Sequence, residues 1–433
     1  MTTSIAELAG ILQKLLTEDA NDLGRETGFI KRARKFNGAS FAQALVFGWQ
    51  ASPQASLEDL CQSAQQAGVE ISPQGLQERL NNPQASTFMQ AVLTKGLSYL
   101  VESAGLREDL LARFEGVYIQ DSSIVSLPDA LQSLWRGCGN QKSKNAALKI
   151  HTVFEYQGGG LKFQVVEAYH NDNPLQKHDL PKGSLRLADS GYFKIALFKQ
   201  FNTEGVCWLS RLPARVGIWT GEKVEHLSTY LADFQGDFLD TEVELSAQRL
   251  PCRLIAVRVP DEVAAQRRKR AQNEAQSRPH QLQDQTLTLC AWTIIVTNLS
   301  QAALSVSEAL ILLRLRWQIE LLFKLWKQEA ALDVWRSHKP EQILTEIFSK
   351  LLIVLIQHWL LVLGVWDEPD RSLFKAVKLL RKQAFHLLAA LPDFAHLLAA
   401  LDSILSALPR CKVQKRKARP AAFQLLCLAH PLS

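Results

Sequence analysis

The sequence predicts an α/β protein in which a mixed β-sheet is flanked by helical segments at both ends of the chain. Residues 1–105 and 341–433 carry apolar side chains at helical spacing, residues 117–212 contain short β-rich runs, and a further β-leaning stretch lies within 214–299. The chain has 433 residues, of which 47% are hydrophobic and 21% charged. This length and composition indicate a folded protein with more than one domain.

The N-terminal segment is expected to be helical. Residues 5–16 are amphipathic, residues 56–60 open like a capped helix, and Ser72 and Pro73 place an N-cap and a first-turn proline at the start of another short helix. The last two helices, joined by a turn that contains Gly68, resemble a helix-turn-helix. On that interpretation, side chains of the second helix would contact bases or phosphates, and the candidates are Gln74, Gln77 and Arg79. The alternative is a helical bundle without a role in DNA binding.

The central segment predicts the strands of the sheet. Residues 117–121 form an apolar run that ends in a carboxylate, Asp121, and residues 184–188 form another that ends at Asp189. Between them, 148–156 and 161–169 predict a hairpin around the glycine-rich turn 157–160, and a helix over 193–201 and a strand over 207–212 follow. Functional residues of open α/β sheets gather at strand ends, so Asp121 and Asp189 are candidate site residues.

The segment from Arg316 to Lys327 is the most informative of the chain. Each helical residue turns by about 100°, so Arg316, Glu320 and Lys327 share one stripe, while the adjacent face is apolar and would anchor the helix to a core through Leu315, Ile319, Leu322 and Phe323. Alone, an arginine and a glutamate at this spacing are usually a surface ion pair. Together with Asp121 and Asp189, however, three carboxylates can hold two Mg²⁺ ions for phosphoryl transfer, with Arg316 and Lys327 on the phosphates.

The charge is modest overall but unevenly distributed. The formal net charge is +6, and dense basic clusters occur at 412–419 and in the run Arg267, Arg268, Lys269 and Arg270. Such clusters suit a polyanion, and solvated loops are the alternative. The apolar run 351–366 is short for a bilayer span and contains Gln357 and His358, which favours a buried helix in a soluble, cytoplasmic protein without a membrane partner.

Three motifs resemble those of the IS4 family of insertion-sequence transposases. The first is Asp121 followed by Ser122 and Ser123, and the second is Asp189-Ser190-Gly191-Tyr192. The third is the family signature in which Tyr, Arg, Glu and Lys are separated by two, three and six residues; Arg316, Glu320 and Lys327 match it, and Leu313 takes the place of the Tyr. The resemblance extends over roughly residues 110–425.

The resemblance implies a ribonuclease H-like catalytic domain of the DDE type. Asp121, Asp189 and Glu320 would be the catalytic residues and would bind two Mg²⁺ or Mn²⁺ ions. The implied activity is cut-and-paste transposition through a hairpin intermediate, by a homodimer on double-stranded DNA that carries terminal inverted repeats, with transfer into target DNA. When bound to DNA, such a protein would be associated with the nucleoid.

Further DNA-binding candidates follow from the resemblance. Trp292 would hold a flipped base, or else it is a core tryptophan on a β-strand. Arg211 would contact DNA or pair with a carboxylate. Arg316 and Lys327 complete the set, together with the cluster Arg267, Arg268, Lys269 and Arg270.

The expected domains are five segments of the chain. They are a helical DNA-binding domain (1–105), the first part of the catalytic core (106–213), a β-rich insertion (214–299), the second part of the core with the glutamate helix (300–340), and a helical C-terminal domain with a basic tail (341–433). Leu313 leaves an alternative, a catalytically impaired or domesticated copy that only binds DNA, and a nuclease that does not join strands is a second one.

Overall fold

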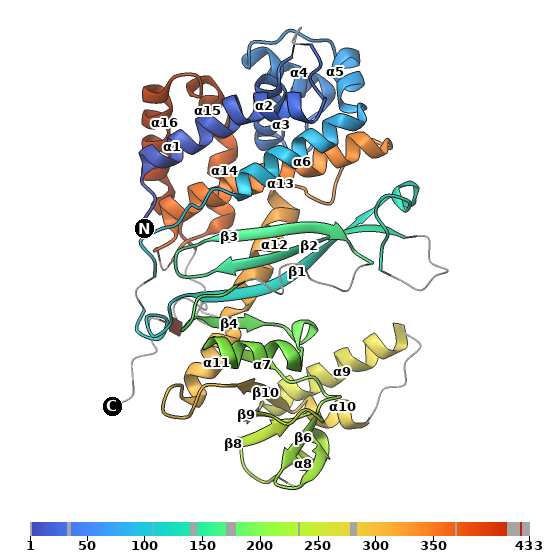
Figure 1. Cartoon of the computed structure of the whole chain (residues 1–433), viewed down its shortest axis with the longest axis vertical. Helices are drawn as coiled ribbons and strands as arrows, with labels where there is room; N and C mark the ends of the chain where they lie inside the picture. The colour runs from blue at the N-terminus through green and yellow to red at the C-terminus, as the bar shows by residue number, and fades with distance from the viewer. Residues whose placement is uncertain are drawn as a thin grey trace. The chain divides into compact units, whose positions relative to one another are not determined.

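The computed structural model describes residues 2–32, 36–106, 108–138, 145–169, 179–232, 234–277, 284–368, 370–413 and 425–426. It confirms a mixed α/β fold with helical N- and C-terminal regions (Figure 1). The chain divides into two compact units, each assembled from separate stretches of sequence. The first unit comprises 1–107, 122–177 and 319–419, and the second comprises 108–121, 178–318 and 420–433.

Helices from both ends of the chain build most of the first unit. Side chains of Ser4, Asn37, Ser56, Ser72 and Asn82 accept backbone N–H groups and so fix the starts of five of the N-terminal helices. The N-terminal helices are α1 (Ile5–Lys14), α2 (Ala20–Glu26), α3 (Gly38–Ala51), α4 (Leu57–Gln66), α5 (Pro73–Leu80) and α6 (Pro83–Leu97). The later ones are α13 (Pro340–Val365), α14 (Leu373–Lys382), α15 (Ala384–Ala390) and α16 (Phe394–Ala407).

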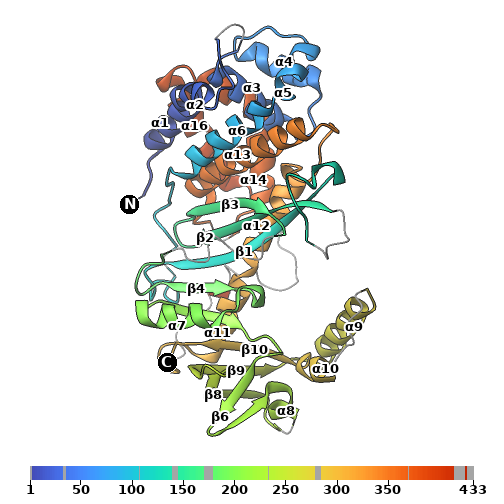
Figure 2. The same ribbon diagram turned by 45° about the vertical axis from the view of Figure 1, so that its right-hand side comes forward.

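Helix α13 forms the centre of the first unit. It packs against α6 and α3 (Figures 1 and 2). Its length and composition would suffice to cross a membrane, but 89% of its most apolar 18-residue window is buried inside the fold. The prediction of a buried helix from the run 351–366 is therefore confirmed.

A hairpin completes the first unit. Strands β2 (Ala146–Glu155) and β3 (Leu161–Glu167) pair antiparallel from Leu148 opposite Glu167 to Phe154 opposite Leu161, as the sequence predicts. The turn needs glycine, because Gly159 has a φ of +81° and a Cβ there would lie 2.6 Å from Val362 of α13.

The second unit contains a sheet of mixed direction in the order β1-β4-β5-β10-β9-β8-β6-β7. The strands are β1 (Val117–Leu127), β4 (Leu185–Ala188), β5 (Cys207–Arg211), β6 (Gly217–Thr220), β7 (Lys223–His226), β8 (Phe238–Leu245), β9 (Leu250–Arg258) and β10 (Trp292–Thr297). Strands β1, β4 and β5 are parallel, and those beyond β5 pair antiparallel. The β-leaning segments of 214–299 thus continue the edge of this sheet.

One strand of the sheet differs from the prediction. Strand β1 does not end at Asp121 but continues to Leu127; its residues up to Asp121 belong to the second unit and those from Ser122 onward to the first. The basic cluster at 267–270, for which solvated loops were the alternative to a polyanion-binding surface, lies on a helix, α9 (Asp261–Ser277). Helical continuity explains this, because 261–277 contains neither Gly nor Pro.

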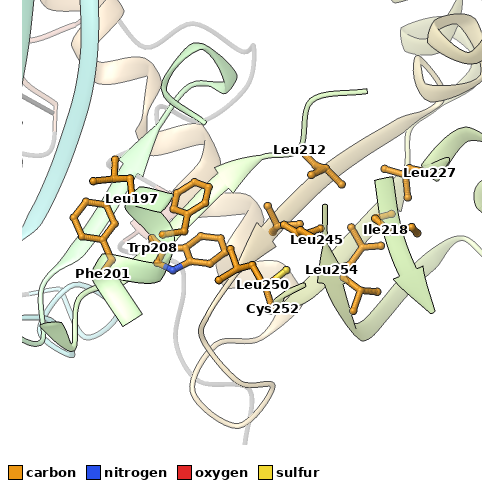
Figure 3. Packing of buried hydrophobic residues seen from close by; sticks show 14 of the residues in the cluster. Leu197, Phe201, Trp208, Leu212, Ile218, Leu227, Leu245, Leu250, Cys252 and Leu254 are labelled. Atoms are coloured by element: carbon orange, nitrogen blue, oxygen red, sulfur yellow. The ribbon is translucent and has the colours of Figure 1, made fainter. Parts of the chain in front are cut away.

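The remaining helices of the second unit are α7 (Ile195–Glu204), α8 (Leu227–Ala232), α10 (Asp284–Leu289) and α11 (Val306–Leu315). One hydrophobic core joins α7 and β5 to the strands β8 and β9 (Figure 3). In it, Trp208 stacks on Phe198 with ring centroids 4.1 Å apart, and its indole N–H donates to Asn202. This core holds α7 and β5 against β8 and β9.

Candidate active site

Asp121 and Asp189 lie side by side in the second unit. The parallel ladder between β1 and β4 ends with Gln120 opposite Ala188, so each aspartate is the next residue on its strand. Asp189 has extended backbone geometry and precedes a short 3-10 turn, Ser190–Tyr192. The predicted strand end is confirmed for Asp189, which directly follows β4, whereas Asp121 lies within β1 at the point where its ladder with β4 stops.

One guanidinium lies between the two carboxylates. Arg316 Nη1 is 3.3 Å from Asp121 Oδ2, and Arg316 Nη2 is 4.0 Å from Asp189 Oδ1. The Arg316 side chain is 6% exposed, against 19% for Asp121 and 41% for Asp189. Because burial weakens screening by water, this cation holds the two like-charged carboxylates together more effectively than a surface arginine could.

Arg316 is placed by the helix that precedes it. It follows α11 as its C-cap in right-handed helical geometry, and its backbone N–H donates to Leu312 O at 3.3 Å. The start of α11 is fixed by Ser305, whose side chain and that of Glu308 cap each other's backbone N–H groups.

A second buried cation lies on the other face of the same strands. Arg186 is fully buried, and its Nε donates to Gln120 Oε1 at 2.6 Å while its guanidinium lies 5.3 Å from the centroid of Phe201. Side chains alternate along a strand, so Arg186 and Gln120 point away from the face that carries the aspartates. Burial lowers the pKa of Arg186 to about 9, which still leaves it charged at neutral pH. It adds positive potential beneath the carboxylates.

Glu320 and Lys327 lie on α12 (Trp317–Glu329), which begins in the second unit and belongs to the first from Ile319 onward. Glu320 is in the first turn, four residues after Arg316. Lys327 donates from Nζ to Ile124 O at 3.0 Å and so fastens the helix to β1 within the first unit. The predicted core face is confirmed, because these side chains are at most 8% exposed: Leu315, Ile319, Leu322 and Phe323.

Trp292 lies in the hydrophobic core, in agreement with the second interpretation of its role. It is 4% exposed, the Arg258 guanidinium covers its ring at 4.4 Å, and Phe234 packs against it at 6.1 Å between centroids. Its ring is therefore not on the surface where a base could stack. Trp317, by contrast, is 50% exposed and directly follows Arg316. The exposure of Trp317 could have been predicted from the sequence, because Trp317 lies outside the apolar stripe of α12.

The basic cluster on α9 divides into one structural and three exposed residues. Arg267 donates to Trp292 O at 2.8 Å and to Thr293 Oγ1 at 3.2 Å, which ties α9 to β10, and its partial burial lowers its pKa. Arg268, Lys269 and Arg270 are exposed. Arg211 ends β5, where it pairs with Ile295. The parallel ladder between β4 and β5 ends with Ala188 opposite Ser210, so Arg211 is the next residue on β5 and Asp189 the next residue after β4.

The two aspartates suit a divalent cation. Both carboxylates reach the same guanidinium, so their oxygen atoms converge on a common point, and carboxylate oxygens are the ligands that Mg²⁺ and Mn²⁺ prefer. Within the described part of the chain no three His, Cys, Asp or Glu side chains form a metal-binding group. Asp121 and Asp189 are therefore the carboxylates of the second unit that could hold such a cation.

Comparison with known proteins identifies the class. Residues 112–356, more than half of the chain, match the family model described as "Transposase DDE domain", and the chain belongs to this family of polynucleotidyl transferases. A transposase for insertion sequence element IS231C from Bacillus thuringiensis subsp. berliner is 26% identical in an alignment of 361 positions, gaps included, that covers 77% of this chain and 75% of the relative. A transposase for element IS1151 from Clostridium perfringens is 23% identical in an alignment of 447 positions, gaps included, that covers 95% of this chain and 93% of the relative.

A third relative matches only locally. A putative transposase, InsL, for element IS186A from Escherichia coli (strain K12) is 35% identical over 122 residues, which cover 28% of this chain and 33% of the relative. Together these matches confirm the resemblance to the IS4 family of insertion-sequence transposases.

Proposed function

We propose that this protein cuts the ends of an insertion sequence and joins them to target DNA, with Asp121, Asp189 and Glu320 as its catalytic carboxylates. The observation that carries the proposal is the pair of aspartates at the end of the β1–β4 ladder with Arg316 between them. Glu320 follows Arg316 by one helical turn in the order and spacing of the family signature.

In this proposal each residue has a distinct role. Asp121 and Asp189, with Glu320, would hold two Mg²⁺ or Mn²⁺ ions, which when bound activate the attacking oxygen and stabilise the leaving oxygen of phosphoryl transfer. Arg316 keeps the aspartates in place before the metal binds and then pairs with a phosphate of the DNA. Lys327, already fastened to β1, holds a neighbouring phosphate.

The partners belong to the proposal as well. We infer that the substrate is double-stranded DNA with terminal inverted repeats, that two copies of the chain act on paired ends, and that the protein associates with the nucleoid when bound. In the N-terminal helices, α4 and α5 are joined by a turn at Gly68, which has a φ of +81°, and Gln74 and Gln77 of α5 are exposed. This arrangement supports DNA reading by residues 1–105.

A cleavage assay tests the function. Purified wild-type protein and Glu320→Gln are incubated with Mg²⁺ and a duplex that carries the inverted-repeat end of the element, and the strands are resolved on a denaturing gel. Cleavage at the repeat boundary by the wild type alone supports the proposal. DNA that is retarded but uncut by both proteins supports the DNA-binding alternative.

Leu313 is the specific reason to keep that alternative. It lies on α11 and is 6% exposed, where the family signature has a tyrosine. If the wild type fails to cut, Leu313→Tyr is the next variant, and recovery of cleavage would assign the defect to this position. Products joined to a target plasmid distinguish a transposase from a nuclease that only hydrolyses DNA.

A further inference from the structure

Helix α14 presents a stripe of lysines to solvent. Lys375, Lys378 and Lys382 are all exposed and follow one another at intervals of three and four residues, so they lie on one face of the helix. The opposite face is buried through Ala376, Val377 and Leu380. The helix packs against α13, α15 and α3 of the first unit, and none of its residues is acidic (Figures 1 and 2).

The stripe is fixed to the end of the helix that carries Glu320. Glu329, the last residue of α12, is 9% exposed and lies 3.4 Å from Arg381 Nη1 and 3.7 Å from Lys378 Nζ. One buried carboxylate thus positions α14 against α12. The Glu329 carboxylate neutralises the charge of the partly buried Arg381. Lys378, in contrast, is 63% exposed, so its ammonium group remains accessible to solvent.

More positive charge is attached at the other end of α14. Residues 411 and 412 are bonded there, because Lys375 Nζ donates to Lys412 O at 2.8 Å and Ser372 N donates to Cys411 O at 2.7 Å. Residues 414–419 of the predicted basic cluster lie outside the described residues. Lys412 itself lies 3.6 Å from Glu368. The basic side chains of this region are Lys375, Lys378, Arg381, Lys382, Arg410 and Lys412. Glu329 pairs with Lys378 and Arg381, and Glu368 pairs with Lys412.

We propose that this surface, the α14 lysine stripe formed by Lys375, Lys378 and Lys382, binds the phosphate backbone of duplex DNA. Like charges on one face raise the local positive potential and so attract a polyanion, and each lysine that meets a phosphate releases a counterion. The stripe contains no aromatic side chain or amide for reading bases, so its contacts are independent of sequence. The inference rests on the proposed function, since it takes DNA as the partner, and it adds a second contact surface outside the catalytic residues.

The test measures affinity against salt. A labelled duplex of random sequence is titrated with the full chain by fluorescence anisotropy, without divalent metal, at several KCl concentrations. The triple variant Lys375→Gln, Lys378→Gln, Lys382→Gln is compared with a control that removes the same charge elsewhere, at exposed Lys14, Lys162 and Lys199. Glutamine has nearly the helix propensity of lysine, and Lys162 of the control is an exposed position on β3, so both variants should remain folded. Thermal unfolding of each variant verifies this.

The expected result is a weaker salt dependence for the stripe variant alone. The slope of log affinity against log salt should fall by about 3, one unit for each lost phosphate contact, and the control should stay near the wild type. Equal slopes for stripe and control variants would overturn the inference, and cleavage of the repeat end by the wild type would show that the proposed function still stands. Wild-type protein that neither binds nor cuts DNA would overturn both.

Single-stranded RNA serves as a competitor in the same titration. If the stripe variant loses affinity for RNA but not for the DNA duplex, the surface recognises a different polyanion and the inference is wrong. Equal loss for duplexes of unrelated sequence supports a backbone contact.

Discussion

The guanidinium of Arg316 and the carboxylate of Asp121 form an ion pair with Nη1 and Oδ2 3.3 Å apart, although 195 residues separate them in the chain. The pair is largely buried, and the second nitrogen of the same guanidinium lies 4.0 Å from Asp189. The arginine of the family signature is therefore bound to the two aspartates and not only to its own helix. Its planar shape matters, because one group reaches two carboxylates at once.

Replacement of Arg316 should impair cleavage more than DNA binding. Arg316→Ala leaves two neighbouring carboxylates without their shared cation, and we expect cleavage to slow by about 10²–10³-fold, as when one preorganised charge contact is removed. Arg316→Lys keeps the charge but cannot reach both aspartates, so its rate should also fall well below the wild type. Single-turnover cleavage measures this, with exposed Lys324→Gln as the control. Full activity of Arg316→Lys would contradict the bridging role.

Two tryptophans should behave in opposite ways. Trp292 is 4% exposed and packed in the core, so Trp292→Ala should cost about 3–5 kcal/mol of unfolding free energy. Trp317 is 50% exposed beside Arg316, so Trp317→Ala should change stability by less than about 1 kcal/mol but reduce affinity for cleaved DNA ends, since an exposed ring can stack on a base. Urea unfolding and anisotropy separate the two effects. An unstable Trp317→Ala would indicate a packing role instead.

The sequence predicted the strands that carry Asp121 and Asp189, because a short apolar run followed by a carboxylate is a local pattern. It also predicted the apolar face of α12, which depends on helical spacing alone. It did not predict that β1 continues past Asp121 to Leu127, since Ser122 and Ser123 are polar residues that local patterns place in loops. Pairing with neighbouring strands overrides that preference.

Properties that depend on tertiary contacts could not be read from the sequence. Burial of Trp292 follows from the packing of Arg258 and Phe234 around it, and the bond from Arg267 to Trp292 O removes one member of an apparently exposed basic cluster. The bridging of both aspartates by Arg316 also requires the fold of α11 onto the sheet. In each case the partners are distant in sequence, so periodicity carries no information about them.

A buried ion pair should stabilise the turn after α12. Lys350 is 1% exposed, lies 2.6 Å from Glu346, and donates to Ala331 O and Val334 O at 3.0 and 2.6 Å. Lys350→Met leaves Glu346 buried without its cation and should cost about 3–5 kcal/mol. Adding Glu346→Leu should restore much of the loss, because an apolar pair needs no desolvation of charge. Urea unfolding of Lys350→Met, Glu346→Leu and the double variant gives a double-mutant cycle. If the losses of unfolding free energy of the two single variants add up in the double variant, the two side chains are not energetically coupled and the prediction is wrong.

The first unit should lose stability as the pH falls, in part through His358. This imidazole is fully buried in α13, its Nε2 donates to Gly159 O at 2.6 Å, and burial lowers its pKa from 6.5 to about 4. Within the described residues its Nδ1 has no hydrogen-bond partner, so a proton there would be buried without an acceptor.

Because the folded-state pKa lies below the unfolded one, the unfolded chain takes up this proton first as the pH decreases. His358 should therefore destabilise the fold progressively between pH 6.5 and 4, by on the order of 3 kcal/mol at the acidic end, while above pH 6.5 its effect is absent. His358→Gln keeps a donor for Gly159 O but does not titrate, so its unfolding free energy should depend less on pH in this window. His396→Gln, at a side chain that is 83% exposed, is the control. Identical pH dependence in wild type and His358→Gln would show that other groups, such as the similarly buried His151, account for the acid sensitivity.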